Sequence, residues 1–184
     1  MTVGAPKPTK DIVLDLFDFV WMQLSARLEG LDDHEYLWAP VADVWTVEPE
    51  GDRVVVTGRG PAPGDPPFTT IAWRTWHIAS DCLDGYSSHL FGTTGASVTG
   101  DAWHLRAQPA VADLTAAFEQ FRARLGAMSD SDMWAPIGES FGPFGESSHH
   151  ELVLHAVHEM THHTGEIGTI RDLYRQLEAE RSLL

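Results

Sequence analysis

Apolar residues recur at three- and four-residue intervals through four long segments, a period that matches one face of an α-helix. In the segment Thr9 to Glu29 the stripe consists of Ile12, Val13, Leu16, Phe17, Val20, Leu24 and Leu28. Similar patterns predict a second helix from about Thr69 to Leu90, a third from Pro109 and a fourth from Ser148 to about Arg181. Four such helices in 184 residues predict an all-α four-helix bundle forming one domain over residues 1–184.

Shorter signals divide these helices. The segments Val44-Trp45-Thr46-Val47 and Val54-Val55-Val56-Thr57 flank Glu50-Gly51-Asp52, which predicts a small β-hairpin between the first two helices. Gly85 would bend the second helix or end it early. Ser148 and Glu151 have the spacing of a capping box at the start of the fourth helix. Loops are expected at Arg59 to Pro67, Phe91 to Asp101 and Ser140 to Ser147.

A short pattern occurs twice. Acidic residues and then Trp-Ala-Pro follow the first helix at Leu31 to Pro40, and they follow the third helix at Met128 to Pro136. Either the two halves share a local plan, or the match is a coincidence of ten residues with one gap.

Charge and composition exclude several classes of function. With 27 acidic and 12 basic residues, the net charge of −15 disfavours binding to nucleic acid or to anionic membranes. No apolar run reaches the roughly 20 residues that span a bilayer, and Met1 to Lys10 lacks the apolar stretch of a secretory leader. We therefore expect a cytoplasmic protein. Its one cysteine, Cys82, forms no intrachain disulfide, so a metal site must rely on histidine and carboxylate.

The densest cluster of potential metal ligands lies in the fourth helix. Two pairs have the i, i+4 spacing that suits chelation of one ion, namely His158 with His162 and Glu159 with His163. Each helical residue turns the side chain by about 100°, which places Glu159 and His163 on the apolar face and the other pair on the opposite face. A buried Glu159 carboxylate would need a partner, which a divalent cation could supply. Equally, His163 could be a core histidine bonded to Glu159 without a metal.

A third ligand must come from another helix, and His77 in the aromatic segment Trp73-Arg-Thr-Trp-His77-Ile is the best candidate. Taken alone, His77 would more often be a bonded core histidine. Asp81 could orient a ligand or be solvated, and Glu166 could orient a ligand or accept a proton. Four other histidines of the predicted fourth helix are expected to be solvated. These are His149, His150, His158 and His162.

The chain resembles the DinB-like superfamily of metal-binding four-helix bundles. The resemblance is carried by Thr69-Thr-Ile-Ala-Trp-Arg-Thr-Trp-His77-Ile and by the run from His155 to Tyr174, and loosely by Asp43 to Val47 and Phe141 to Phe144. In this family a histidine of the second helix and two residues four apart on the last helix bind a divalent ion. The matching residues are His77, Glu159 and His163. Histidine is common at all three positions, so Glu159 departs from the pattern, although members similar to maleylpyruvate isomerases have Glu there.

The resemblance implies a divalent metal ion, zinc in the first place, with nickel, manganese or iron as the other candidates. It also implies a thiol-dependent S-transferase or isomerase that acts on a small electrophile with glutathione, bacillithiol or mycothiol. The low-lysine, alanine- and aspartate-rich composition is similar to that of actinobacterial proteins, whose abundant thiol is mycothiol. The alternative is a non-catalytic metal-binding or stress-related bundle that acts through a protein partner.

Two further expectations concern Cys82 and assembly. In an α-helix Cys82 would lie about 140° around the axis from His77, so it should not be a ligand, and the reactive sulfur should come from solution. The expected partner is a small-molecule substrate, with no nucleic acid and no membrane. The assembly state is left open, with a homodimer as one candidate.

Overall fold

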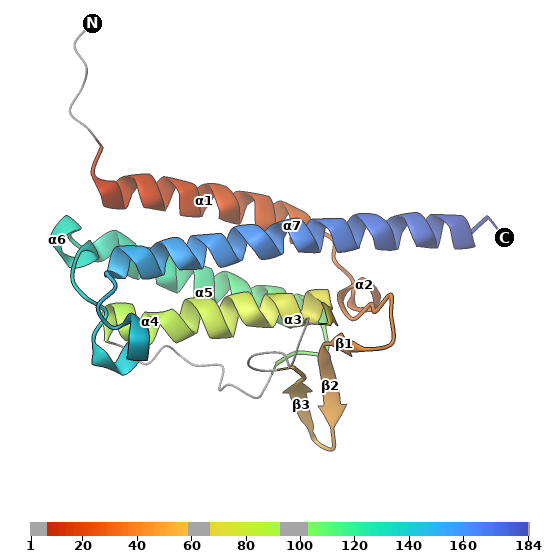
Figure 1. Ribbon diagram of the computed structural model, residues 1–184. Coiled ribbons are helices and arrows are strands. Elements are labelled where there is room, and N and C mark those ends of the chain that lie inside the picture. The colour runs from red at the N-terminus through yellow and green to blue at the C-terminus, as the bar shows by residue number, and fades with distance from the viewer. Residues whose placement is uncertain (1–6, 59–66, 93–102, 184) are drawn as a thin grey trace, which may run out of the picture.

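The computed structural model describes residues 7–58, 67–92 and 103–183. Within them the fold is all-α, and the predicted four-helix bundle is confirmed (Figure 1). The long helices are α1 (Thr9–Leu28), a middle rod made of α3 (Ile71–Trp76), the π-helix η1 (His77–Asp84) and α4 (Gly85–Phe91), then α5 (Ala107–Ala127) and α7 (His149–Arg181). None of the described helices is long and apolar enough to cross a membrane.

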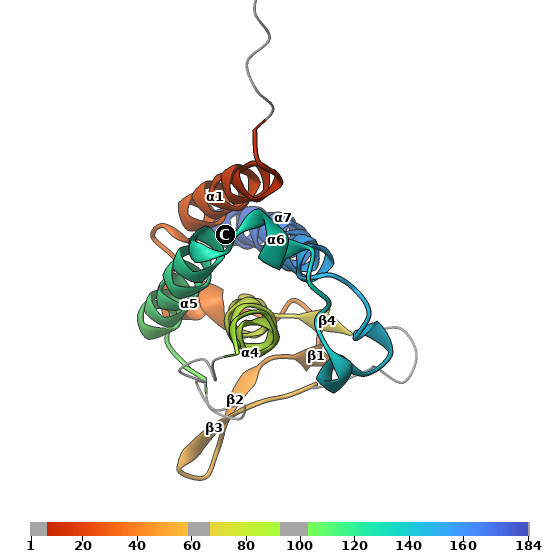
Figure 2. The same ribbon diagram turned by 90° about the vertical axis from the view of Figure 1, so that its left-hand side faces the viewer.

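The four long helices surround one apolar core. Helix α1 packs against α5 and α7, and the middle rod packs against α5 and α7 from the other side, as the end-on view shows (Figure 2). Each long helix contributes side chains with almost no exposed surface, among them Phe17, Leu24, Trp76, Leu83, Leu114, Phe121, Met160 and Ile167. The three- and four-residue apolar spacing of the sequence is the spacing of these buried positions, but Ile12 and Leu16 of the predicted stripe are exposed, by 54% and 45%.

The middle rod differs most from the sequence prediction. It begins at Ile71, after Thr70, whose side-chain oxygen accepts a hydrogen bond from the backbone N–H of Trp73. Gly85 neither bends nor ends it, because Gly85 has ordinary helical angles (φ −58°, ψ −47°). The unpredicted feature is the π-helix, in which backbone hydrogen bonds join residues five apart instead of four.

The predicted hairpin is present with a shorter ladder. Strands β2 (Val47–Glu50) and β3 (Arg53–Val56) pair antiparallel, whereas β1 (Val44–Trp45) pairs parallel with β4 (Phe68–Thr69). Placing β1 in the hairpin was therefore wrong. The chain turns away from the hairpin at Gly58, where a φ of +67° suits glycine. Its Cα also lies against the Trp45 indole, and a Cβ there would be 1.9 Å from the ring.

The other helix boundaries follow their sequence signals closely. Helix α5 begins two residues before the predicted Pro109, and the backbone N–H of Ala107 donates to the Asp33 carboxylate. Helix α7 begins with the predicted capping box of Ser148 and Glu151. Part of the expected loop at Ser140 to Ser147 is a 3-10 helix, η2 (Glu139–Phe144). The other two expected loops lie largely outside the described residues, at 59–66 and 93–102.

The repeated Trp-Ala-Pro pattern corresponds to a repeated structure. A short helix precedes it in both halves of the chain, α2 (Asp33–Tyr36) after α1 and α6 (Asp130–Met133) after α5. Both short helices are capped by a side chain, from Asp32 in the first case and Ser129 in the second. The two halves therefore share a local plan of long helix, capped short helix and turn.

A buried ion pair joins α1, α2 and α7. The Arg171 guanidinium, with 2% of its surface exposed, donates to both carboxylate oxygens of Glu35 at 2.7 and 2.9 Å. It also donates to the backbone oxygens of Arg27, in the last turn of α1, and of Glu29, just after α1. Arg171 thereby satisfies carbonyl groups that a helix end leaves without partners.

Replacing Arg171 by Met should lower the free energy of unfolding by about 3 kcal/mol, because it leaves the buried Glu35 carboxylate only the exposed Arg175, whose Nε lies 3.9 Å away. Urea unfolding measures this loss. Arg181→Met is the matched control, since Arg181 pairs with Glu178 on the surface and should cost less than about 1 kcal/mol. Equal losses for the two variants would contradict the structural role of the buried pair.

Candidate metal centre

The first predicted ligand, His77, is held by the aromatic start of the middle rod. Its ring stacks on the Trp73 indole, with ring centroids 4.9 Å apart and planes 11° from parallel. The Trp73 indole N–H donates to the backbone oxygen of Thr57 at 3.0 Å, just after β3. The hairpin that precedes the rod therefore fixes the indole against which His77 rests.

The three predicted ligands meet between the middle rod and α7. The Nε2 atom of His77 lies 3.3 Å from Oε2 of Glu159, and Nε2 of His163 lies 3.5 Å from the same oxygen. The two imidazole rings are 4.9 Å apart and nearly perpendicular. The structure thus brings His77, Glu159 and His163 together around one carboxylate oxygen.

A carboxylate lies against the other nitrogen of each histidine. The Nδ1 atom of His77 is 3.2 Å from Asp81, and Nδ1 of His163 is 2.7 Å from Glu166. Such a carboxylate fixes an imidazole as the tautomer that carries hydrogen on Nδ1 and presents the Nε2 lone pair to a metal. Both residues that the sequence proposed as orienting groups, Asp81 and Glu166, have the required positions.

The buried Arg74, which sequence reasoning missed, supports Glu166. Its Nε donates to Oε2 of Glu166 at 2.7 Å, the oxygen that also faces His163, and its Nη1 donates to the backbone oxygen of Thr69. Its place three residues before His77 is the one sequence signal that it lies near the site.

The expected position of Cys82 was wrong. Its Sγ lies 3.6 Å from Nε2 of His77, on the same face of the rod. The expectation assumed α-helical geometry between the two residues, whereas the wider turns of η1 bring residues five apart much closer to one face. Cys82 therefore lies at the centre with His77 and Glu159.

The side chains of the centre shift each other's proton affinity. Hydrogen bonds from His163 and His77 hold the pKa of Glu159 well below its ordinary value, although burial opposes this. Burial lowers the pKa of His77, but contacts with Asp81, Cys82 and Glu159 outweigh burial and raise it well above 6.5. For Glu166, burial raises the pKa, while His163 and Arg74 bring it down to about 2. The metal-free centre thus pairs carboxylates with a cationic imidazole, whose charge a metal ion could replace.

Two sets of donor atoms in the described part of the chain are close enough for one ion. Within each set the atoms lie within 4.8 Å of one another, and the sets are His77 with Cys82 and Glu159, and His162 with His163 and Glu166. In the second set Glu166 already accepts from Arg74 and lies against Nδ1 of His163. The contact between Glu159 and Nε2 of His163 links that histidine to the first set. The imidazole, carboxylate and thiol groups of the first set suit a borderline divalent ion such as zinc.

The remaining histidines of α7 lie mostly outside this arrangement. His158 and His162 are exposed, as the helical wheel predicted, and His162 approaches Glu166 at 3.2 Å from the outer side. His149 and His150 are half-buried instead of solvated. His149 contacts the backbone oxygen of Asp132, and the ring of His150 packs on Trp134, which accounts for their partial burial.

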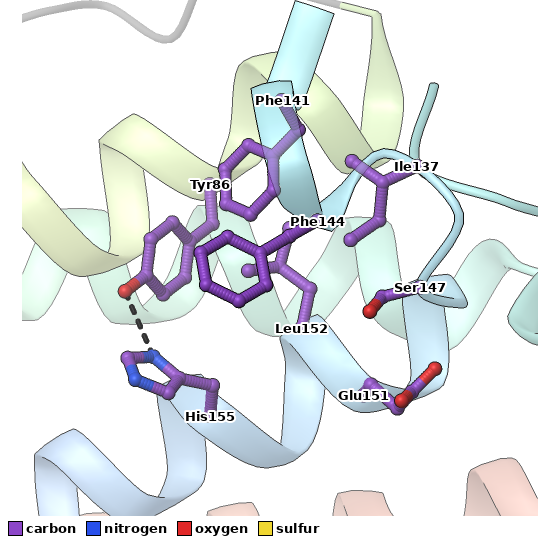
Figure 3. A pocket seen from close by; sticks show the side chains of 8 residues that line it. All are labelled: Tyr86, Ile137, Phe141, Phe144, Ser147, Glu151, Leu152 and His155. Atoms are coloured by element: carbon purple, nitrogen blue, oxygen red, sulfur yellow. Dashed lines mark hydrogen bonds between the residues drawn. The ribbon is translucent and has the colours of Figure 1, made fainter. Parts of the chain in front are cut away.

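An apolar pocket of about 380 Å³ lies where α4, η2 and α7 meet, and none of the three predicted ligands lines it (Figure 3). Its walls come from α4, the segment around η2 and the first turns of α7, with the side chains Tyr86, Ile137, Phe141, Phe144, Leu152 and His155 among them. The Tyr86 hydroxyl lies 2.9 Å from Nδ1 of His155, and Nε2 of His155 lies 3.6 Å from Glu159. Sequence reasoning missed Tyr86 and His155, although His155 precedes Glu159 by one helical turn.

One comparison with known proteins found a match. The profile of the DinB superfamily matches residues 16–167, a range that includes His77, Glu159 and His163. No curated protein and no solved structure matched the chain. Because the profile covers most of the sequence and the fold is a helical bundle, the chain belongs to the DinB superfamily.

Proposed function

We propose that His77, Glu159 and His163 bind one divalent ion, and that the chain uses this ion in thiol-dependent S-transfer or isomerisation of a small electrophile in the cytoplasm. The observation that carries the metal site is the convergence of two Nε2 atoms on one oxygen of Glu159, at 3.3 and 3.5 Å. Donor atoms that share a tetrahedral ion with bonds of about 2.0–2.3 Å lie about 3.3–3.8 Å apart. The separations here fall in that range.

Zinc is the first candidate for the ion. Two imidazoles and one carboxylate suit zinc, and they also suit nickel, manganese or iron. A zinc ion lowers the pKa of a thiol bound to it and so supplies a thiolate nucleophile at neutral pH. The thiolate would come from a low-molecular-weight thiol such as glutathione, bacillithiol or mycothiol.

The residues around the ion would orient the reactants. The pocket lined by His155, which contacts Glu159, has a mainly apolar wall, with Phe141 and Leu152 facing it, which suits the apolar part of an electrophile. The Tyr86 hydroxyl at its inner side, whose pKa burial raises, stays protonated and can donate a hydrogen bond to a polar group of the substrate. The electrophile would thus lie between the aromatic wall and the centre.

The position of Cys82 favours a second candidate function. If its sulfur permanently completes a set of four ligands, the ion is structural, and the bundle acts through a protein partner without catalysis. Turnover with added thiol separates the two functions, since a structural ion supports folding but no reaction.

His77→Ala and His163→Ala should each weaken zinc binding more than about 100-fold. Removing a group that only orients a ligand already lowers metal affinity about 10–100-fold, and these two residues are the proposed ligands themselves. Competition with a chromophoric zinc chelator measures the affinity. His158→Ala is the matched control, being an exposed histidine of the same helix, and should bind zinc like the unaltered chain. His162→Ala tests the neighbouring set of donors, and a comparable loss in that variant would place the ion there instead.

The zinc-loaded protein should consume an electrophile only with a low-molecular-weight thiol present, and His77→Ala should abolish this turnover. The rate should rise with pH until the bound thiol is ionised and then level off, because the thiolate is the nucleophile. The assay pairs each of the three thiols with halogenated and epoxide substrates. A zinc-loaded protein inert toward every pair would support the non-catalytic function.

Phe141→Ala should raise KM for an apolar electrophile about tenfold at similar kcat, since the lost apolar contact is worth about 1–2 kcal/mol. Steady-state kinetics with a short and a long alkyl electrophile measure the effect, which should be larger for the long one. Phe19→Ala, an exposed phenylalanine on α1, is the matched control. An equal change in both variants would remove the pocket from the substrate site.

A further inference from the structure

We propose that Cys82 is a fourth protein ligand of the ion, placed there by the π-helical segment of the middle rod. The inference rests on the metal site of the proposed function, but not on its thiol chemistry. It adds one residue to the three ligands that the family resemblance implies.

The distances suit a shared ion. The separation between Sγ of Cys82 and Nε2 of His77 is 3.6 Å, which also suits a hydrogen bond to sulfur in the metal-free protein. It falls within the range of about 3.3–3.8 Å that separates two ligands of one tetrahedral ion. Cys82, His77 and Glu159 also have donor atoms mutually within 4.8 Å.

The backbone supports the same assignment. A regular α-helix would turn Cys82 about 140° away from His77. Helix η1 runs from His77 to Asp84, so both residues lie within it, and the five-residue repeat returns the sulfur to the histidine's face. π-Helical turns are rare and occur often at functional sites, which fits a segment that aligns two ligands.

Charge balance also suits a thiolate ligand, although burial by itself raises the pKa of the Cys82 thiol. Two neutral imidazoles, the Glu159 carboxylate and a Cys82 thiolate together balance the two charges of a divalent ion. Only 1% of the Cys82 surface is exposed, and as the chain's one cysteine it has no disulfide partner. A thiolate ligand favours zinc over harder ions such as manganese.

This ligand bears on the proposed function. With Cys82 bound, the four protein ligands fill a tetrahedral set, so a thiol from solution would compete with the Cys82 sulfur. Removing that sulfur should therefore tighten the binding of an added thiol to the zinc-loaded protein.

X-ray absorption spectroscopy at the zinc edge tests the proposal on the full-length protein loaded with one zinc per chain and freed of added thiols. We expect one sulfur neighbour at about 2.3 Å beside nitrogen and oxygen neighbours at about 2.0–2.2 Å. The sulfur shell should be lost completely in Cys82→Ser and retained in the matched control His158→Ala. Circular dichroism checks that each variant is folded.

The outcomes separate the two proposals. A zinc shell of only nitrogen and oxygen in the unaltered protein, or sulfur that persists in folded Cys82→Ser, would overturn the role of Cys82 and leave the three-ligand site intact. Failure to bind zinc at all would overturn both. If Cys82→Ser does not fold, cobalt(II) in the unaltered protein still decides, because only a thiolate ligand gives an intense sulfur-to-cobalt charge-transfer band. Absence of that band would contradict the proposal.

Discussion

The contact of two imidazoles with one Glu159 oxygen organises the centre of this bundle. A carboxylate that is largely removed from water needs a cation or hydrogen-bond donors, and here His77 and His163 face it from two helices. Asp81 and Glu166 hold the far nitrogens of these rings. These polar contacts therefore join the middle rod to α7.

Residues from other elements hold these polar contacts in place. The hairpin between the first two helices fixes Trp73 through the backbone oxygen of Thr57, and Trp73 supports the His77 ring. The π-helix then turns Cys82 toward the same point, and Arg74 anchors Glu166. Outside the centre, the Arg171 and Glu35 pair ties the ends of α1 and α2 to α7, the helix that carries two of the three predicted ligands.

The sequence predicted the helices and the relative faces of α7 well, because both follow from a period that apolar residues display directly. Glu159 and His163 were separated from His158 and His162 by this period alone. The position of Cys82 could not be predicted, because it depends on backbone hydrogen bonds that join residues five apart. No residue type signals this change from α-helix to π-helix. The contribution of Tyr86 to the pocket depends on tertiary packing between α4 and α7, which has no local pattern in the sequence.

The most direct test of the metal centre is a crystal structure of the zinc-loaded protein, with anomalous diffraction recorded on both sides of the zinc edge. We expect one strong anomalous peak per chain, about 2.0–2.2 Å from Nε2 of His77, from Nε2 of His163 and from a carboxylate oxygen of Glu159. A peak between His162 and Glu166 instead, or no peak in crystals whose protein binds zinc in solution, would contradict it.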